Sequence, residues 1–140
     1  MVEIKQIIVK IKTGDISGAG TNGKIYLGIG GREFRLDKPG DQFQRNSLDT
    51  FTIGIGSDLE NPDNVNSLPS PNGNINAPNI EEIDIEFNPK YMRFDPNDDS
   101  DNWNVQNVQV DVVDIGKTYK SARDGNIWLG TRSGLFLGLK

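Results

Sequence analysis

The sequence predicts an all-β protein, an antiparallel β-sandwich of about eight strands. Three observations lead to this prediction. Apolar and polar residues alternate with a period of two in most segments, turn residues (Gly, Asn, Asp and Pro) cluster between those segments, and no segment carries the apolar stripe of an amphipathic helix. A chain of 140 residues can bury its own core, so we expect residues 1–140 to form a single domain.

Four alternating segments lie in the first half of the chain. They predict strands at residues 7–12, 24–30, 32–37 and 48–55. Gly30, at the end of the second segment, and Gly31 predict a two-residue hairpin turn into the third segment. Apolar residues at every second position share one face of a strand, which packs into the core. These inward residues are Ile7, Val9, Ile11, Ile25, Leu27, Ile29, Phe34, Leu36, Phe51, Ile53 and Ile55.

The second half of the chain repeats the pattern after a polar interruption. IEEIDIEF at residues 80–87 alternates most strictly, because Ile83, Ile85 and Phe87 are separated by acidic residues, and we expect a strand there. The interruption at residues 56–79 is rich in Asn, Pro, Gly and Ser and predicts a surface-loop insert within the same domain. Further strands are expected at residues 105–113, 117–123, 126–129 and 134–139.

The composition excludes several classes of site. The chain has no Cys and no His, which removes disulfides, thiolate metal centres and the commonest catalytic base, so we expect no enzyme activity. The net charge of −5 argues against nucleic acid, which requires a basic face. The same charge disfavours anionic lipid unless a metal intervenes, and two calcium ions would change it to −1 (−5 + 4).

The sequence leaves the cellular compartment open. No stretch is apolar enough to cross a bilayer, and the charged N-terminus lacks the apolar centre of a signal peptide. Peripheral association with a membrane is expected, in an extracellular setting if the chain is a domain excised from a longer protein.

Oxygen-bearing side chains gather in three of the predicted turns. They are Asn22 in the Gly-rich turn before the second strand, Asp37, Asp41 and Gln42 in the turn LDKPGDQ, and Asp101 in the acidic turn DPNDDSD. Carboxylate, amide and backbone oxygens are the ligands that calcium prefers. If the strand ends bring these turns to one pole, they predict a calcium site. Taken singly, each is also explained as a tight turn in which Asn and Asp cap the backbone.

Apolar side chains adjoin the acidic turn in the segment NPKYMRFDP. Tyr91, Met92 and Phe94 stand between two Pro-containing pairs, which predicts a loop tip instead of a core strand. Exposed apolar side chains beside a metal site suit insertion into a membrane interface. The sequence equally allows these three side chains to pack under the loop as a small apolar cluster.

Together these motifs resemble the PLAT domain family, a module found in lipoxygenases, polycystins, pancreatic lipases and clostridial alpha-toxin. The resemblance rests on TGDISGAGTNGKIYLGIGG, FQRNSLDTFTI, DNWNVQNVQV and IWL, and it covers nearly the whole chain outside residues 56–79. It implies a PLAT-like sandwich with calcium loops at one pole, and it matches Tyr91 and Phe94 to a membrane-entering tip. The calcium-binding residues that it implies are Gly20, Thr21, Asn22, Asp37, Gly40, Asp41, Gln42, Asp101 and Asn102.

Three positions depart from the alpha-toxin pattern. Gly18 stands where the toxin has a ligand aspartate, and Asn22 and Gln42 each replace another. Fewer charged ligands weaken calcium binding, so one to two ions are expected. The implied function is a non-catalytic, calcium-binding module for membrane or lipid association, with headgroups or a membrane-associated protein as partner. The alternative is a protein–protein docking module that anchors an enzyme or a membrane protein.

Overall fold

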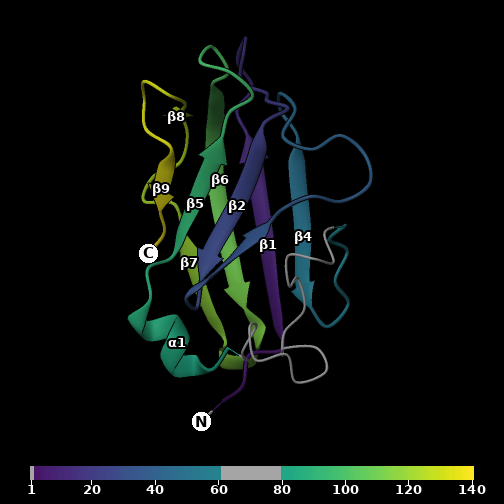
Figure 1. Ribbon diagram of the computed structural model, residues 1–140, viewed down its shortest axis with the longest axis vertical. Helices are drawn as coiled ribbons and strands as arrows, with labels where there is room; N and C mark the ends of the chain where they lie inside the picture. The colour runs from purple at the N-terminus through teal and green to yellow at the C-terminus, as the bar shows by residue number, and fades with distance from the viewer. Residues whose placement is uncertain (1, 61–79) are drawn as a thin grey trace.

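Nine strands and two short helical elements make up the part of the chain that the computed structural model describes, residues 2–60 and 80–140 (Figure 1). The strands are β1 (Gln6–Thr13), β2 (Lys24–Ile29), β3 (Arg32–Arg35), β4 (Leu48–Gly54), β5 (Tyr91–Asp95), β6 (Trp103–Val112), β7 (Lys117–Lys120), β8 (Ile127–Leu129) and β9 (Phe136–Gly138). The helical elements are α1 (Glu82–Phe87) and the 3₁₀ turn η3 (Val113–Ile115).

The strands pair into two sheets that lie face to face (Figure 1). One has the order β4-β1-β6-β7, with β8 also paired to β6, and the other has the order β3-β2-β5-β9. All of these pairings are antiparallel. The predicted antiparallel β-sandwich is therefore confirmed. The predicted insert at 56–79 begins in the turn after β4, and its residues 61–79 lie outside the described part of the chain.

The core lies between the inward faces of the two sheets. Ten of the eleven residues predicted to face inward from the first four segments are at most 2% exposed, and Ile55 is the exception at 59% because β4 ends at Gly54. Trp103 is fully buried, and its indole N–H donates to the Thr13 hydroxyl at 3.1 Å. The period-two pattern therefore identified the core-facing side of β1 to β4.

Residues 80–87 do not form the expected strand. Six of them form α1, and of the three residues expected to face inward only Ile85 is buried, while Phe87 is 79% exposed. At the start of the helix the Glu81 side chain accepts from a first-turn backbone N–H, and Asp84 reaches back to the Glu81 N–H. This capping box satisfies backbone donors that a helix leaves free. The acidic residues that produced the apparent alternation thus stabilise a helix start.

The predicted loop tip is also wrong, because its residues form β5 between β2 and β9. Met92 and Phe94 are fully buried, and the Phe94 ring lies 5.9 Å from the Trp103 ring. Tyr91 points to the outer face, where its hydroxyl donates to Glu33 at 2.7 Å. Inward apolar side chains flanked by sheet partners on both sides belong to the core, so Met92 and Phe94 cannot contact a membrane in this fold.

Candidate functional site

Loops far apart in the sequence meet at one end of the sandwich, here called the loop pole (upper end in Figure 1). It consists of the β1–β2 loop (residues 14–23), the β3–β4 loop (36–47) and the β5–β6 loop (96–102). Thr21 ties them together: its backbone N–H donates to the Phe43 carbonyl at 2.9 Å, and its hydroxyl donates to the Asp101 carboxylate at 2.7 Å. The fold therefore brings the three predicted oxygen-bearing turns to one place.

The backbone of Phe43 determines how the β3–β4 loop approaches its neighbours. Phe43 has a φ of 60°, a left-handed conformation that aromatic residues rarely adopt. Its ring packs in the core 5.6 Å from Phe51 and 5.5 Å from Trp103, and its N–H donates to the buried Asp49 carboxylate at 2.9 Å. Strained residues persist where their surroundings hold them. These contacts fix the backbone of Phe43. The side chain of the next residue, Gln44, then reaches Thr21 and Asn22 in the β1–β2 loop.

Two glycines permit the close approach of the loops. At Gly20 a Cβ atom would lie 3.1 Å from Gln44 Cα, and at Gly23 it would lie 2.8 Å from the Asp95 carbonyl oxygen and 3.0 Å from the Asp101 carboxylate. These distances are shorter than normal van der Waals contact. The resemblance implied that Gly20 is a calcium-binding residue, and the structure adds a steric requirement for glycine there.

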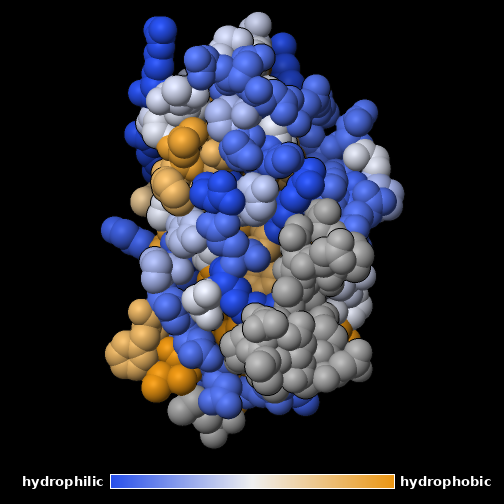
Figure 2. Space-filling view, in the orientation of Figure 1, coloured by the Kyte–Doolittle hydropathy of each residue, from blue (hydrophilic) through white to orange (hydrophobic). Residues whose placement is uncertain are grey.

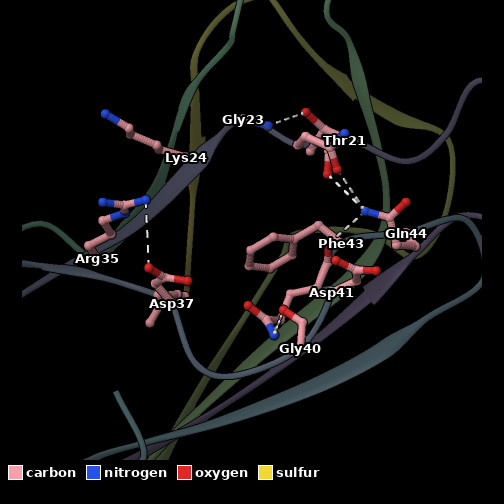
Figure 3. A pocket seen from close by; sticks show the side chains of 12 residues that line it. Thr21, Gly23, Lys24, Arg35, Asp37, Gly40, Asp41, Phe43 and Gln44 are labelled. Atoms are coloured by element: carbon pink, nitrogen blue, oxygen red, sulfur yellow. Dashed lines mark hydrogen bonds and ion pairs between the residues drawn. The ribbon is translucent and has the colours of Figure 1, made fainter. Parts of the chain in front are cut away.

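A hollow of about 160 Å³ lies between the β1–β2 and β3–β4 loops (Figure 3). We call it the polar pocket. Six of the nine predicted calcium-binding residues line it, namely Thr21, Asn22, Asp37, Gly40, Asp41 and Gln42. The remaining lining residues are Gly23, Lys24, Arg35, Leu36, Phe43 and Gln44.

Three oxygen atoms of the polar pocket converge on the side-chain amide nitrogen of Gln44 (Figure 3). The nitrogen lies 3.1 Å from Asn22 Oδ1, 3.1 Å from the Gln42 carbonyl oxygen and 3.4 Å from the Thr21 carbonyl oxygen. All three oxygens accept hydrogen bonds, so they surround a point that favours positive charge. Neutral oxygens of these kinds are also calcium ligands.

Four charged side chains line the same pocket, and their formal charges cancel. Lys24 and Arg35 are cationic, while Asp37 and Asp41 are anionic. Asp37 Oδ2 lies 3.6 Å from Arg35 Nη2, whereas the Asp41 carboxylate has no partner within residues 2–60 and 80–140. No three acidic side chains of those residues cluster tightly enough to hold a metal ion by themselves. The possible donors are mainly neutral oxygens, and the carboxylate of Asp41 is free, a combination that would hold a calcium ion only weakly.

A second hollow of about 410 Å³, the acidic pocket, lies between the β1–β2 and β5–β6 loops. Its lining residues are Gly18, Ala19, Gly20, Thr21, Asn22, Gln44, Arg45, Asn97, Asp98, Ser100 and Asp101. Asp101 holds the loops in register, since it accepts from the Thr21 hydroxyl and from the Asn97 N–H at 2.9 Å. Hydrogen bonds from the Ser100 hydroxyl and N–H hold the pKa of Asp98 below its ordinary value, so this exposed carboxylate is stabilised as an anion.

Asn102 lies apart from both pockets. It lines a neighbouring hollow with Asp99 and Arg132, and its side-chain amide donates to the Ser100 carbonyl at 3.1 Å. Its oxygen packs over Gly130, where a Cβ would lie only 2.1 Å away. The predicted calcium residues therefore divide among adjoining hollows, and Asn102 is the one that lines neither of the two main pockets.

Four exposed apolar side chains, in the loops and in the strands that adjoin them, were not predicted from the sequence. They are Ile16, Leu48, Leu135 and Phe136, which are 43%, 65%, 36% and 61% exposed. Figure 2 shows an apolar patch over β9, where the Phe136 ring meets the Tyr91 ring edge-on at 5.6 Å. The adjacent pair LF in the segment SGLFLG was the available signal, but the segment was interpreted as a strand alone. In the described residues no helix is long and apolar enough to cross a membrane.

A family model described as the PLAT/LH2 domain matches residues 7–132, whereas no curated protein matches the chain. Among solved structures, alpha-toxin from Clostridium absonum is 27% identical with a TM-score of 0.65, and alpha-toxin from an avian strain of Clostridium perfringens is 22% identical with a TM-score of 0.64. Each match covers 99% of this chain and 32% of the toxin chain. A LOX variant is 17% identical with a TM-score of 0.57 and is covered over 16% of its length, a likeness of fold alone. The chain thus spans about a third of the toxins' length.

Proposed function

The chain belongs to the PLAT/LH2 domain family. On that premise we propose that it is a non-catalytic module that binds membranes peripherally through the loop pole, and that this binding depends on calcium. PLAT domains are generally non-catalytic modules, and the likeness to the toxin domain fits binding to membranes, lipids or proteins. The observation that carries the calcium part of the proposal is the polar pocket, where oxygens from two loops converge beside an unpaired carboxylate.

In this proposal the polar pocket holds the ion. Asn22 Oδ1, the Asp41 carboxylate and the carbonyl oxygens of Thr21 and Gln42 are the candidate ligands, and Asp37 adds a second charge when it leaves Arg35. A bound calcium ion would neutralise these carboxylates and offer free coordination positions to the phosphate oxygens of a lipid headgroup. A second ion beside Asp101 stays a prediction.

Exposed apolar side chains supply the remaining contact with the membrane. Leu48 is 65% exposed and directly follows the β3–β4 loop, and Phe136 is 61% exposed on the edge strand β9. Burying a large apolar side chain completely contributes about 1.5–3 kcal/mol. Burying the exposed part of Phe136 therefore contributes about 1.4 kcal/mol, which is roughly tenfold in affinity.

Vesicle sedimentation tests the proposal. Vesicles of phosphatidylserine and phosphatidylcholine are sedimented with the protein in calcium and again in excess EGTA. We expect binding in calcium, loss of binding in EGTA, and weaker binding by Asp41→Ala and by Phe136→Ser. The matched control is Phe87→Ser, which removes a 79% exposed ring from α1 at the opposite end and should bind like the wild type. Binding that EGTA leaves unchanged contradicts the calcium mechanism, and full binding by Phe136→Ser contradicts the choice of surface.

A protein-docking function is the second candidate, and a separate observation favours it. Exposed apolar side chains also gather at the end opposite the loop pole, on α1, on η3 and beside the start of β1. They are Val2, Ile55, Ile83, Phe87 and Val113. Figure 2 shows the part of this group that lies over α1. A docking function predicts that Phe87→Ser abolishes capture of a protein partner while vesicle binding is unaffected.

A further inference from the structure

The side chain of Gln44 lies in the place where a cation would be surrounded by the oxygens of the polar pocket. Its amide group has two hydrogens but contacts three oxygens, at 3.1, 3.1 and 3.4 Å (Figure 3). Only the nitrogen end of the amide suits this place, because an amide oxygen would face three acceptors. The partial positive charge of the N–H groups therefore attracts these three oxygens as a cation would.

The three oxygens lie at hydrogen-bonding distance from the Gln44 nitrogen, which is longer than a calcium–oxygen bond. Calcium binds oxygens at about 2.3–2.6 Å, well inside the 3.1–3.4 Å found around the Gln44 nitrogen. An ion can reach these oxygens only if the Gln44 amide leaves and the two loops close in. Calcium and the Gln44 amide thus cannot both occupy the place between these three oxygens.

The backbone keeps Gln44 in this position. Phe43 before it is fixed by its buried ring, by the hydrogen bond to Asp49 and by the hydrogen bond from Thr21. The Gln44 backbone also lies directly over Gly20, whose missing Cβ leaves room for it. The side chain itself is exposed and can swing into solvent without disturbing the core.

We propose that Gln44 is a built-in competitor that sets the calcium affinity of the polar pocket, an inference that rests on the proposed function. The amide keeps the pocket oxygens satisfied when calcium is scarce and is displaced when calcium is abundant. The neutral charge balance of the pocket strengthens this effect, because little net negative charge draws the ion in. The domain would respond to high calcium concentrations and would ignore low ones.

Two substitutions of Gln44 test whether its side-chain amide competes with calcium for the polar pocket. Gln44→Ala removes the competing amide, and we expect calcium to bind about three- to tenfold tighter, since one or two net hydrogen bonds no longer oppose it. Gln44→Glu replaces the amide with a carboxylate among three oxygens, and we expect at least about tenfold tighter binding because affinity follows ligand charge. Calcium should also stabilise Gln44→Glu against unfolding more than it stabilises the wild type, since a more tightly bound ion favours the folded state more.

Calcium titration by calorimetry on wild type, both variants and Gln6→Glu tests the proposal. Gln6 lies at the far end of β1 and donates to the Ile55 carbonyl, so Gln6→Glu adds the same charge away from the loop pole and should not change affinity. If the wild type binds calcium and Gln44→Ala binds equally or less tightly, the competitor function is overturned while the calcium site stands. If neither the wild type nor Gln44→Glu binds calcium, the proposed calcium function fails together with the competitor.

A measurement without calcium checks the position of Gln44 by itself. In EGTA, the side-chain amide hydrogens of Gln44 should exchange with solvent more slowly than those of an unbonded glutamine, as measured by NMR. Exchange at the rate of free glutamine overturns the inference regardless of the calcium result.

Discussion

Removing the Asp49 carboxylate should destabilise the loop pole, because Asp49 holds the backbone of Phe43 in place. Asp49 is 8% exposed, and one of its oxygens accepts from the Phe43 N–H and from the Ser47 hydroxyl, each at 2.9 Å. In Asp49→Ala the Phe43 N–H has lost its acceptor inside the protein. The hydrogen bond that helps to hold Phe43 at a φ of 60° is lost as well.

The size of the effect follows from these two hydrogen bonds. A buried donor without an acceptor costs about 1–3 kcal/mol, and a hydrogen bond to a charged group contributes about 1.5–3 kcal/mol. Because the part-buried Ser47 hydroxyl can turn to water, we expect a total loss of about 3 kcal/mol in the free energy of unfolding. With an unfolding entropy of about 2.1 cal/mol/K per residue, a chain of this length should unfold about 10 °C lower.

Urea and thermal unfolding followed by far-UV circular dichroism measure this loss. Asp49→Asn is the matched control, because it keeps the shape and one acceptor oxygen, and we expect it to lose only about 1 kcal/mol. A loss below about 1 kcal/mol for Asp49→Ala would refute the reasoning, since the carboxylate would then contribute no more than an exposed hydrogen bond.

Three further predictions follow from the contacts described above. Gly20→Ala should destabilise the fold by about 1–3 kcal/mol and weaken calcium binding, because its Cβ would meet the backbone nitrogen of Arg45; unchanged calorimetric affinity would contradict this. Phe94→Ala should lose about 3–5 kcal/mol in urea unfolding, whereas an exposed membrane tip would lose little. The hydrogen bond from Arg93 lowers the pKa of Glu33, so this pair stabilises the fold above the unfolded pKa of the glutamate and ceases to do so as pH falls through the lower folded pKa. Arg93→Ala should raise the Glu33 pKa in an NMR titration, and an unchanged titration would contradict the assignment.

The strands could be predicted because one face of each sheet is buried. At β1, every second residue must be apolar, so Ile7, Val9 and Ile11 report both the strand and its orientation. The same rule failed for α1, because six residues are too few to separate alternation from a capped helical turn. It failed differently for β5, since the flanking prolines suggested a loop where Met92 and Phe94 are core.

The loops of the candidate site could be predicted from their motifs, but not the contacts within them. The oxygen-bearing side chains and the glycines of these turns identify Asn22 and Asp41 as candidate calcium ligands from the sequence alone. The placement of Gln44 depends on the left-handed backbone at Phe43, which a buried ring and Asp49 maintain. A conformation imposed by tertiary packing on an aromatic residue leaves no local trace in the sequence.

The hydrogen bond between Thr21 and Asp101 joins residues 80 positions apart, which determines when in folding the loop pole can form. Contacts between distant residues form slowly, because a long stretch of chain must be ordered first. Because Thr21 follows β1 and Asp101 directly precedes β6, the loop pole should assemble only after these two strands have paired. A cation that binds only the finished pole would slow unfolding and leave the folding rate nearly unchanged. A chain shortened to residues 1–60 keeps two of the three loops but lacks β6, so it cannot build the pole at all.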